Sequence, residues 1–151
     1  MSKYAGEDIM KPALILLHEE SLRMTHPVFH IAPEGTRVIY VWDDMYVQRA
    51  AYSLKRLIFI YETLCELEVD ILRGDTRSIL QEINPSLVYI PNTNNPLILQ
   101  MIASIRELMS VEMVADDPFI NLKQAIVFKR FFQYWRKAEK KAFLHDGGLN
   151  A

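Results

Sequence analysis

Five short apolar runs, each typical of a buried β-strand, recur along this chain and constrain its fold more than any other feature. They lie at residues 13–17 (ALILL), 37–42 (RVIYVW), 69–72 (VDIL), 87–90 (LVYI) and 111–115 (VEMVA). The segments between them place apolar residues at helical spacing. Strands that are apolar throughout and alternate with helices are typical of a parallel sheet covered on both faces. The pattern therefore predicts a three-layer, Rossmann-like α/β fold with five parallel strands.

Helical spacing and turn signals predict where the intervening helices lie. The clearest helix is predicted over residues 45–67, where apolar side chains three or four residues apart make one face. The residues of this face are Val47, Ala50, Ala51, Leu54, Leu57, Ile58, Tyr61, Leu64 and Cys65. A GDT turn precedes a short helix at 77–83, which ends before Pro85 because the residue before proline avoids helical geometry. Pro96 is predicted to occupy the first position of a further helix.

The end of the chain carries a strongly amphipathic segment. Phe128, Phe131, Phe132 and Trp135 fall on one helical stripe, with lysines and arginines opposite. We expect a C-terminal helix over residues 120–144 that packs on the sheet or on a partner. The predicted organisation is thus an α/β domain at 13–119 followed by this helix, with loose tails at 1–12 and 145–151.

Composition excludes several classes of protein. The chain has 151 residues, is 50% hydrophobic and carries a net charge of −2, which fits one globular domain and gives no positive field to attract nucleic acid. We therefore expect no direct nucleic-acid binding. No apolar stretch approaches the roughly 20 residues that span a bilayer, and the first residues lack a signal-peptide pattern, so we expect a cytoplasmic protein without a membrane segment. The single cysteine, Cys65, is expected to be a small core residue.

Four stretches, taken in order, resemble the amino-terminal α/β domain of the DNA photolyase and cryptochrome family. They are residues 21–29 (SLRMTHPVF), 42–44 (WDD) leading to Arg49, 73–75 (RGD) with 79–80 (IL), and 127–137 (VFKRFFQYWRK). The resemblance covers about residues 13 to 140. It implies a flavodoxin-like or HUP-like five-stranded parallel sheet. It also implies a pocket for an antenna chromophore, of a flavin or deazaflavin type, at the carboxyl ends of the strands.

The chain also departs from the family pattern. Glu19 and Glu20 stand where family members usually carry two arginines, and residues 88–97 (VYIPNTNNPL) lack the arginine, acid and tyrosine of the family motif. The Asn-Glu pair that holds folate in some members would fall at residues 97–98, which are Leu and Ile, so a folate antenna is not expected. The flavin-binding helical half has no counterpart here, so we expect no FAD site in this chain.

The candidate site residues are those predicted to follow the strands or to begin the next helix. They are His18, Glu19, Arg23, Asp43, Asp44, Arg49, Asn92 and Asn94. Each has a structural alternative: the two aspartates as helix caps, Arg49 as a solvated or acid-paired helix residue, His18 as a structural histidine, and the asparagines as turn residues.

No catalytic or metal site is predicted. Glycine-rich phosphate loops are excluded, because Gly35 and Gly74 are the only glycines between residues 8 and 146. Ser21 lacks the Gly-x-Ser-x-Gly context of a hydrolase nucleophile. His26 and His30 are four residues apart but lack a third ligand for zinc.

The leading functional hypothesis is a stand-alone, non-catalytic relative of the photolyase antenna domain that binds a chromophore or small molecule, or acts as an interaction module. A first alternative is one half of a split deoxyribodipyrimidine photolyase, a DNA-repair enzyme, in which residues 120–143 dock a separate FAD-domain partner. The same segment could instead support a homodimer. A second alternative is an unrelated nucleotide-dependent enzyme that uses the pocket around His18, Glu19, Asp43 and Arg49.

Overall fold

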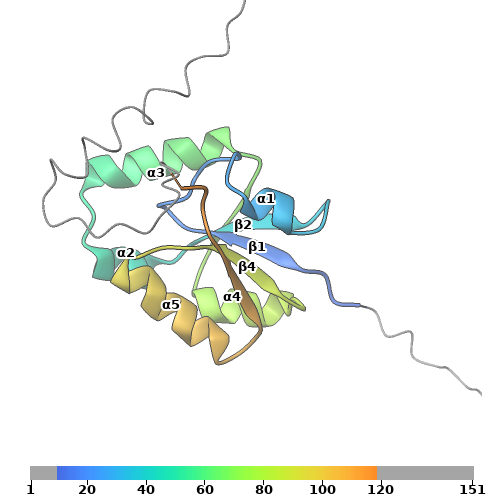
Figure 1. Cartoon of the computed structure of the whole chain (residues 1–151). Helices are drawn as coiled ribbons and strands as arrows, with labels where there is room; N and C mark the ends of the chain where they lie inside the picture. The colour runs from blue at the N-terminus through green and yellow to red at the C-terminus, as the bar shows by residue number, and fades with distance from the viewer. Residues whose placement is uncertain (1–9, 119–151) are drawn as a thin grey trace, which may run out of the picture. The chain divides into compact units, whose positions relative to one another are not determined.

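A computed structural model describes residues 10–118 and shows a five-stranded sheet in the order β3-β2-β1-β4-β5 (Figure 1). Every pair of neighbouring strands runs parallel. The strands are β1 (Leu14–Leu17), β2 (Arg37–Trp42), β3 (Asp70–Arg73), β4 (Val88–Pro91) and β5 (Val111–Val114). Each boundary lies within one residue of its predicted run. The Rossmann-like α/β fold is confirmed, and this strand order matches the first five strands of the Rossmann arrangement.

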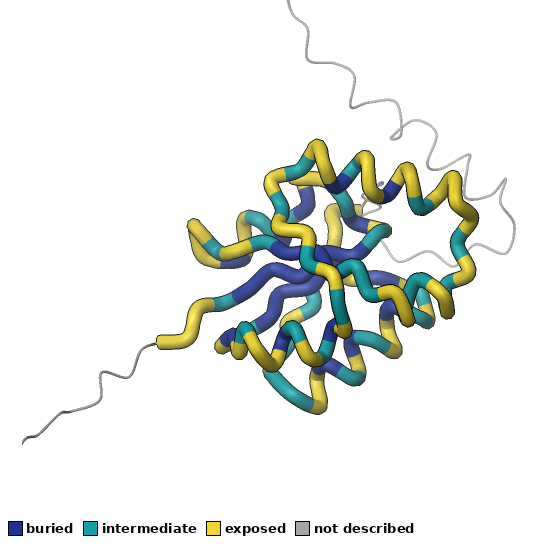
Figure 2. The backbone as a smooth tube through the Cα atoms, turned by 180° about the vertical axis from the view of Figure 1, so that it is seen from behind, coloured by how far each residue is buried: buried dark blue, intermediate teal, exposed yellow. Residues whose placement is uncertain are grey.

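Helices cover both faces of the sheet. They are α1 (Val28–Ile31), α2 (Asp44–Ala50), α3 (Leu54–Glu66), α4 (Thr76–Ile83) and α5 (Pro96–Arg106). In Figure 1, α1 and α3 lie above the sheet, whereas α4 and α5 lie below it. Successive side chains of a strand point to opposite faces of the sheet. In β1, Leu14 and Leu16 therefore join the core between the sheet and helices α4 and α5. Ile15 and Leu17 join the core between the sheet and helices α1 and α3. All four are buried, as expected for the central strand (Figure 2).

The predicted continuous helix over residues 45–67 is wrong. Ala51 adopts a left-handed conformation, with φ of 51°, and ends α2, and Ser53 then caps α3 by accepting a hydrogen bond from the backbone N–H of Arg56. The apolar spacing continues across the break, so periodicity alone did not reveal it. Ser53 was the available signal, because serine is a favoured residue at helix amino termini.

The predicted apolar face of this segment is also wrong in part. Ile60 and Leu64 are the buried residues of α3, whereas Ile58 and Tyr61, which belong to the predicted apolar face, are exposed. Cys65 is exposed as well, so it is not the core residue that the sequence suggested. The core-facing side of α3 is therefore rotated away from the side with the strongest apolar spacing.

The other helix signals are confirmed. Asp75 caps α4 through the backbone N–H of Ser78, α4 ends at Ile83 with Asn84 in the left-handed region, and Asn95 caps α5 with Pro96 at its start. Within residues 10–118, no helix is both long enough and apolar enough to cross a lipid bilayer. The predicted helix over 120–144, the tail at 145–151 and most of the tail at 1–12 lie outside the described residues.

Candidate functional site

The carboxyl ends of the five parallel strands form one edge of the sheet, and most of the predicted site residues follow these ends. His18 follows β1, Asp43 follows β2 and Asn92 follows β4. The strand order changes direction between β1 and β4, which makes this position the topological switch point. Open α/β sheets bind ligands at such a point, so this edge is the first place to expect a site.

The side chain of His18 occupies the switch point between β1 and β4. Its ring is buried, and Nε2 lies 2.8 Å from the carbonyl oxygen of Pro91, at the end of β4. On the other side of the ring, Nδ1 accepts a hydrogen bond from the backbone N–H of Glu20. Because one partner is an acceptor and the other a donor, the ring is the neutral tautomer with the proton on Nε2. Burial lowers the pKa of His18, which favours this neutral form.

Glu20 makes a second connection between the loops that follow β1 and β4. Its carboxylate accepts hydrogen bonds from the hydroxyl of Thr93, at 2.6 Å, and from the side-chain amide of Asn95, at 2.9 Å. Burial alone would raise the pKa of Glu20, but these two bonds, together with the electrostatic effects of His18 and Arg56, lower the pKa. The crevice at the switch point is thus filled by the protein's own side chains.

Glu19 ties the first loop to the region around α2. Its Oε1 atom accepts hydrogen bonds from the hydroxyls of Tyr46, in α2, and Tyr52, in the break before α3. Burial, followed by the bond to Glu19, raises the pKa of both phenols. The first loop is therefore anchored on both sides by adjacent glutamates.

Asp43 acts as a cap and as a connection between two helix starts. Its Oδ1 atom accepts from the backbone N–H groups of Met45 and Tyr46, and its Oδ2 atom accepts from both the backbone N–H and the hydroxyl of Thr76. Burial would raise the pKa of Asp43, but the four donors outweigh it and lower the pKa. The capping alternative is confirmed for Asp43, and the same carboxylate fixes the start of α4 against the start of α2.

Other predicted residues lie farther from this network. Asp44 is the first residue of α2 rather than its cap, and it forms an exposed ion pair with Arg73, 2.8 Å apart. Arg49 donates to the side-chain carbonyl of Gln100, at 2.8 Å, rather than pairing with either aspartate. Arg23 forms an exposed ion pair with Asp116, after β5.

The two predicted asparagines lie on the surface of the loop after β4. Asn92 is exposed and accepts a hydrogen bond from the backbone N–H of Thr93, which is turn chemistry, and Asn94 is also exposed. The residues of this loop that reach the switch point are instead Thr93 and Asn95, through Glu20.

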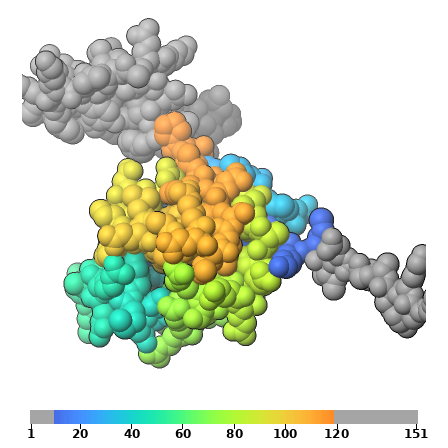
Figure 3. All heavy atoms as spheres, turned by 90° about the horizontal axis from the view of Figure 1, so that it is seen from below, coloured from blue at the N-terminus to red at the C-terminus, as the bar shows by residue number. Residues whose placement is uncertain are grey.

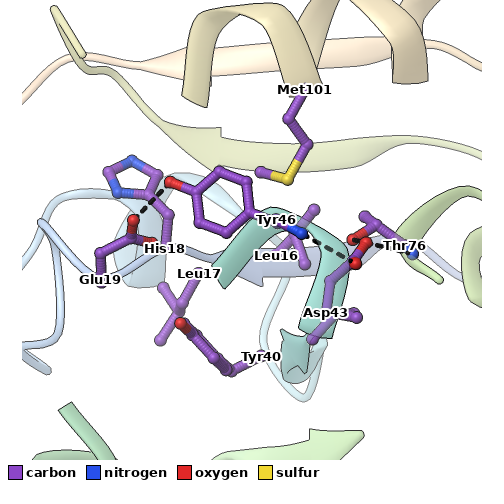
Figure 4. A pocket seen from close by; sticks show the side chains of 10 residues that line it. Leu16, Leu17, His18, Glu19, Tyr40, Asp43, Tyr46, Thr76 and Met101 are labelled. Carbon is purple, nitrogen blue, oxygen red and sulfur yellow. Dashed lines mark hydrogen bonds between the residues drawn. The ribbon is translucent and has the colours of Figure 1, made fainter. Parts of the chain in front are cut away.

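A very small cavity lies between this network and the core. Figure 4 shows His18, Glu19, Asp43, Tyr46, Thr76 and Met101 around it. Its volume is about 10 Å³, which is room for one water molecule. This cavity cannot hold a chromophore.

A larger pocket opens beside it, between α2, α4 and α5, and is called here the α2–α4–α5 pocket. Figure 3 shows these helices side by side, with α2 in teal, α4 in green and α5 in yellow to orange. The volume of the pocket is about 200 Å³. Its lining residues are Asp43, Met45, Tyr46, Arg49, Asp75, Thr76, Arg77, Leu97, Gln100, Met101 and Ser104.

Two arginines from different helices line this pocket. Arg49, in α2, donates to Gln100 of α5, and Arg77, in the first turn of α4, donates to the backbone carbonyl of Ser104 and to Glu107. A guanidinium carries five N–H donors in a planar fork, so each arginine can also bind an anion while keeping these bonds. The two acids of the lining, Asp43 and Asp75, point their oxygens at helix N–H groups. The pocket thus offers cationic donors beside the apolar side chains of Met45, Leu97 and Met101.

The histidine pair is not arranged as a metal site. His26 is fully buried and accepts a hydrogen bond from the backbone N–H of Val28, whereas His30 is exposed. Within residues 10–118, no group of three or more histidines, cysteines or acids is placed to hold a metal ion.

Sequence reasoning missed several residues of the edge. Thr76 and Arg77 begin the helix after β3, and Gln100 and Met101 lie on the second turn of α5. The strand-end rule could have indicated Thr76 and Arg77, because they follow the GDT turn at the end of β3. Gln100 and Met101 come from mid-helix positions that no local pattern marks.

No protein-family model matches this chain, and no curated protein sequence is significantly similar to it. The side chains at the carboxyl edge are therefore the observations on which a function can rest.

Proposed function

We propose that this chain is a stand-alone relative of the photolyase and cryptochrome antenna domain, and that it binds a small anionic ligand in the α2–α4–α5 pocket without catalysing a reaction. The observation that supports this most is that two arginines from different helices, Arg49 of α2 and Arg77 of α4, line one pocket at the carboxyl edge. The five-stranded parallel sheet and the position of the pocket agree with what the family resemblance implies.

The hydrogen-bonding of the acids and of His18 favours binding over catalysis. A general acid or base must reach a proton of the substrate within hydrogen-bond distance. His18 is buried and bonded at both ring nitrogens, and the carboxylates of Glu19 and Asp43 are held by hydroxyl and N–H donors of the protein. A nucleotide-dependent enzyme built on His18 would have to break this network to use it.

The size of the pocket limits the ligand. Pockets that enclose most of a drug-sized ligand measure roughly 300–1,000 Å³, and this one measures about 200 Å³. The pocket therefore accepts a phosphate or a single ring, with the rest of a larger molecule in solvent. A flavin or deazaflavin nucleotide would enter by its phosphate, which the two arginines can bind in a bidentate manner.

Ligand titration tests the proposal. We expect FMN, AMP or inorganic phosphate to bind the purified chain in isothermal titration calorimetry, and Arg49→Ala and Arg77→Ala each to weaken binding about tenfold or more. Arg37→Ala is the matched control, because Arg37 begins β2 at the opposite edge of the sheet and forms an exposed ion pair with Asp70. Binding that is unchanged in both pocket variants, or no binding of the three probes at millimolar concentration, would contradict the proposal.

An absorption spectrum of freshly purified protein adds a second measurement. A band between the near ultraviolet and the blue that disappears in Arg49→Ala protein would identify a retained chromophore in this pocket. Co-purification with a separate flavoprotein would instead favour the split-photolyase alternative.

A further inference from the structure

Helix α3 carries a second apolar stripe besides the one it buries. Leu54 is 73% exposed, Ile58 is 49% exposed and Tyr61 is 54% exposed. Cys65, one turn farther on, is exposed too. A helix on the surface of a single domain normally has one apolar stripe, directed at its own core, and Ile60 and Leu64 already form it here. The ring of Tyr61 also packs edge-on against Trp42 of β2, with 6.3 Å between ring centroids, and the rest of the exposed stripe has its apolar surface available to a partner.

The spacing of the exposed stripe is that of a helix-pairing interface. Leu54, Ile58, Tyr61 and Cys65 are separated by four, three and four residues, which is the alternating spacing of the a and d positions in a heptad repeat. We call these four residues the α3 seam. The helix has 13 residues and is about 20 Å long, which is enough for the four seam residues to meet a second helix along its length.

The charges beside the α3 seam indicate which partner surface it fits. Lys55 and Glu62 are seven residues apart, so they lie along the same side of the helix next to the seam. In an antiparallel pair of α3 helices, Ile58 lies opposite the partner's Tyr61. Lys55 then lies beside the partner's Glu62, and by symmetry Glu62 lies beside the partner's Lys55. A parallel pair would bring like charges to the same level. The charge pattern is thus complementary to itself under a two-fold axis.

We propose that the α3 seam is a homodimer interface, in which the seams of two copies of this chain pack antiparallel across a two-fold axis. Ile58 and Tyr61 form the centre of the interface, and two Lys55–Glu62 pairs flank it. The contact is isologous, so it closes as a dimer and does not propagate into a filament. Its modest size places the affinity in the micromolar range rather than the nanomolar range.

Sedimentation analysis of the full chain tests the hydrophobic part of the proposal. The protein is studied from about 1 to 200 µM, around the expected micromolar affinity, with a reductant present because exposed Cys65 lies in the seam. We expect a monomer–dimer equilibrium, and we expect Ile58→Glu to weaken it about tenfold or more. Phe59→Glu is the matched control, since Phe59 is 66% exposed on the same helix but lies outside the seam. Circular dichroism confirms that each variant is folded.

Charge reversal tests the geometry. Lys55→Glu and Glu62→Lys should each weaken the dimer, because each places like charges beside one another across the axis. The double variant carrying both changes should restore the dimer, because the pairs are re-formed with opposite sign. A wild-type protein that is monomeric throughout the range would overturn the proposal. A dimer insensitive to Ile58→Glu, or one that the double reversal does not rescue, would overturn it equally.

Discussion

The imidazole of His18 donates through Nε2 to the carbonyl oxygen of Pro91, over 2.8 Å, and so joins the ends of β1 and β4. These two strands flank the topological switch point, which is where open α/β sheets generally bind ligands. In this chain the position is occupied by a protein side chain instead. The consequence is that the available pocket lies to one side, between α2, α4 and α5.

Removing the imidazole should destabilise the fold. His18→Ala leaves the N–H of Glu20 without its acceptor, removes the bond to Pro91 and opens a cavity in a buried place. The expected loss in the free energy of unfolding is about 2–4 kcal/mol, measured by urea denaturation. His30→Ala is the control, because His30 is exposed and its removal should cost less than about 0.5 kcal/mol. Equal effects of the two variants would contradict the structural role of His18.

The same histidine should make stability depend on pH. Burial lowers the pKa of His18 below the usual 6.5, so between that value and the folded pKa the unfolded chain binds a proton that the folded chain does not. The stability that the neutral His18 side chain contributes is therefore complete above pH 6.5 and is lost as the pH falls through the folded pKa. The expected slope is at most about 1.4 kcal/mol per pH unit. The free energy of unfolding of wild type and of His18→Gln is measured by urea denaturation between pH 7.5 and 5. The difference between their slopes against pH is the contribution of His18, and equal slopes would contradict the prediction.

Replacing the acceptor of the two phenols should be visible in the tyrosine titration. Burial and the bonds to Glu19 raise the pKa of Tyr46 and Tyr52, so Glu19→Gln should shift part of the tyrosinate absorbance toward pH 10. As the pH rises, the unfolded chain loses these phenolic protons at a lower pH than the folded chain does. The free energy of unfolding of the wild type should therefore fall above pH 10, and that of Glu19→Gln should fall less steeply. The variant should also lose about 1–2 kcal/mol at neutral pH. Glu66→Gln, on the exposed side of α3, is the control and should leave the alkaline titration unchanged.

The strands could be predicted from the sequence because a buried parallel strand is apolar along its whole length. The run 14–17 needs no context to be identified, since both faces of β1 are covered. The division between α2 and α3 was missed because it depends on one residue, Ala51, in a left-handed conformation that alanine rarely adopts. Local preference favoured a helix there, and the surrounding structure overrode it.

The candidate site was predictable only as a region. Strand ends point to His18, Asp43 and the loop after β4, and these do meet at one edge. Their partners were not predictable, because the contacts of His18 with Pro91 and of Glu20 with Thr93 join residues 73 positions apart. Such pairs are set by the strand order, which a single sequence does not determine.

Asp43 and Asp44 give the sharpest comparison of a fold-determining acid with a surface acid, because they are adjacent and of the same type. The Asp43 carboxylate accepts from four donors at the starts of α2 and α4, whereas Asp44 has one exposed ion pair with Arg73. Asp43→Ala should therefore lose about 2–3 kcal/mol, since it removes a cap and leaves both donors of Thr76 without their acceptor. Asp44→Ala should lose no more than about 1 kcal/mol, as exposed ion pairs contribute little.

The acid side of the stability curve provides a second readout for the same aspartate. The hydrogen bonds lower the folded pKa of Asp43 below 3.8, so its contribution is present above pH 3.8 and is lost as the pH falls through the folded value. Asp43→Asn cannot titrate and presents an amide N–H₂ toward the donors of Thr76, so we expect it to be less stable than wild type at neutral pH. The difference between the two proteins should shrink below pH 3.8. A constant difference in urea denaturation across this range would show that the carboxylate charge is not what holds the two helix starts together.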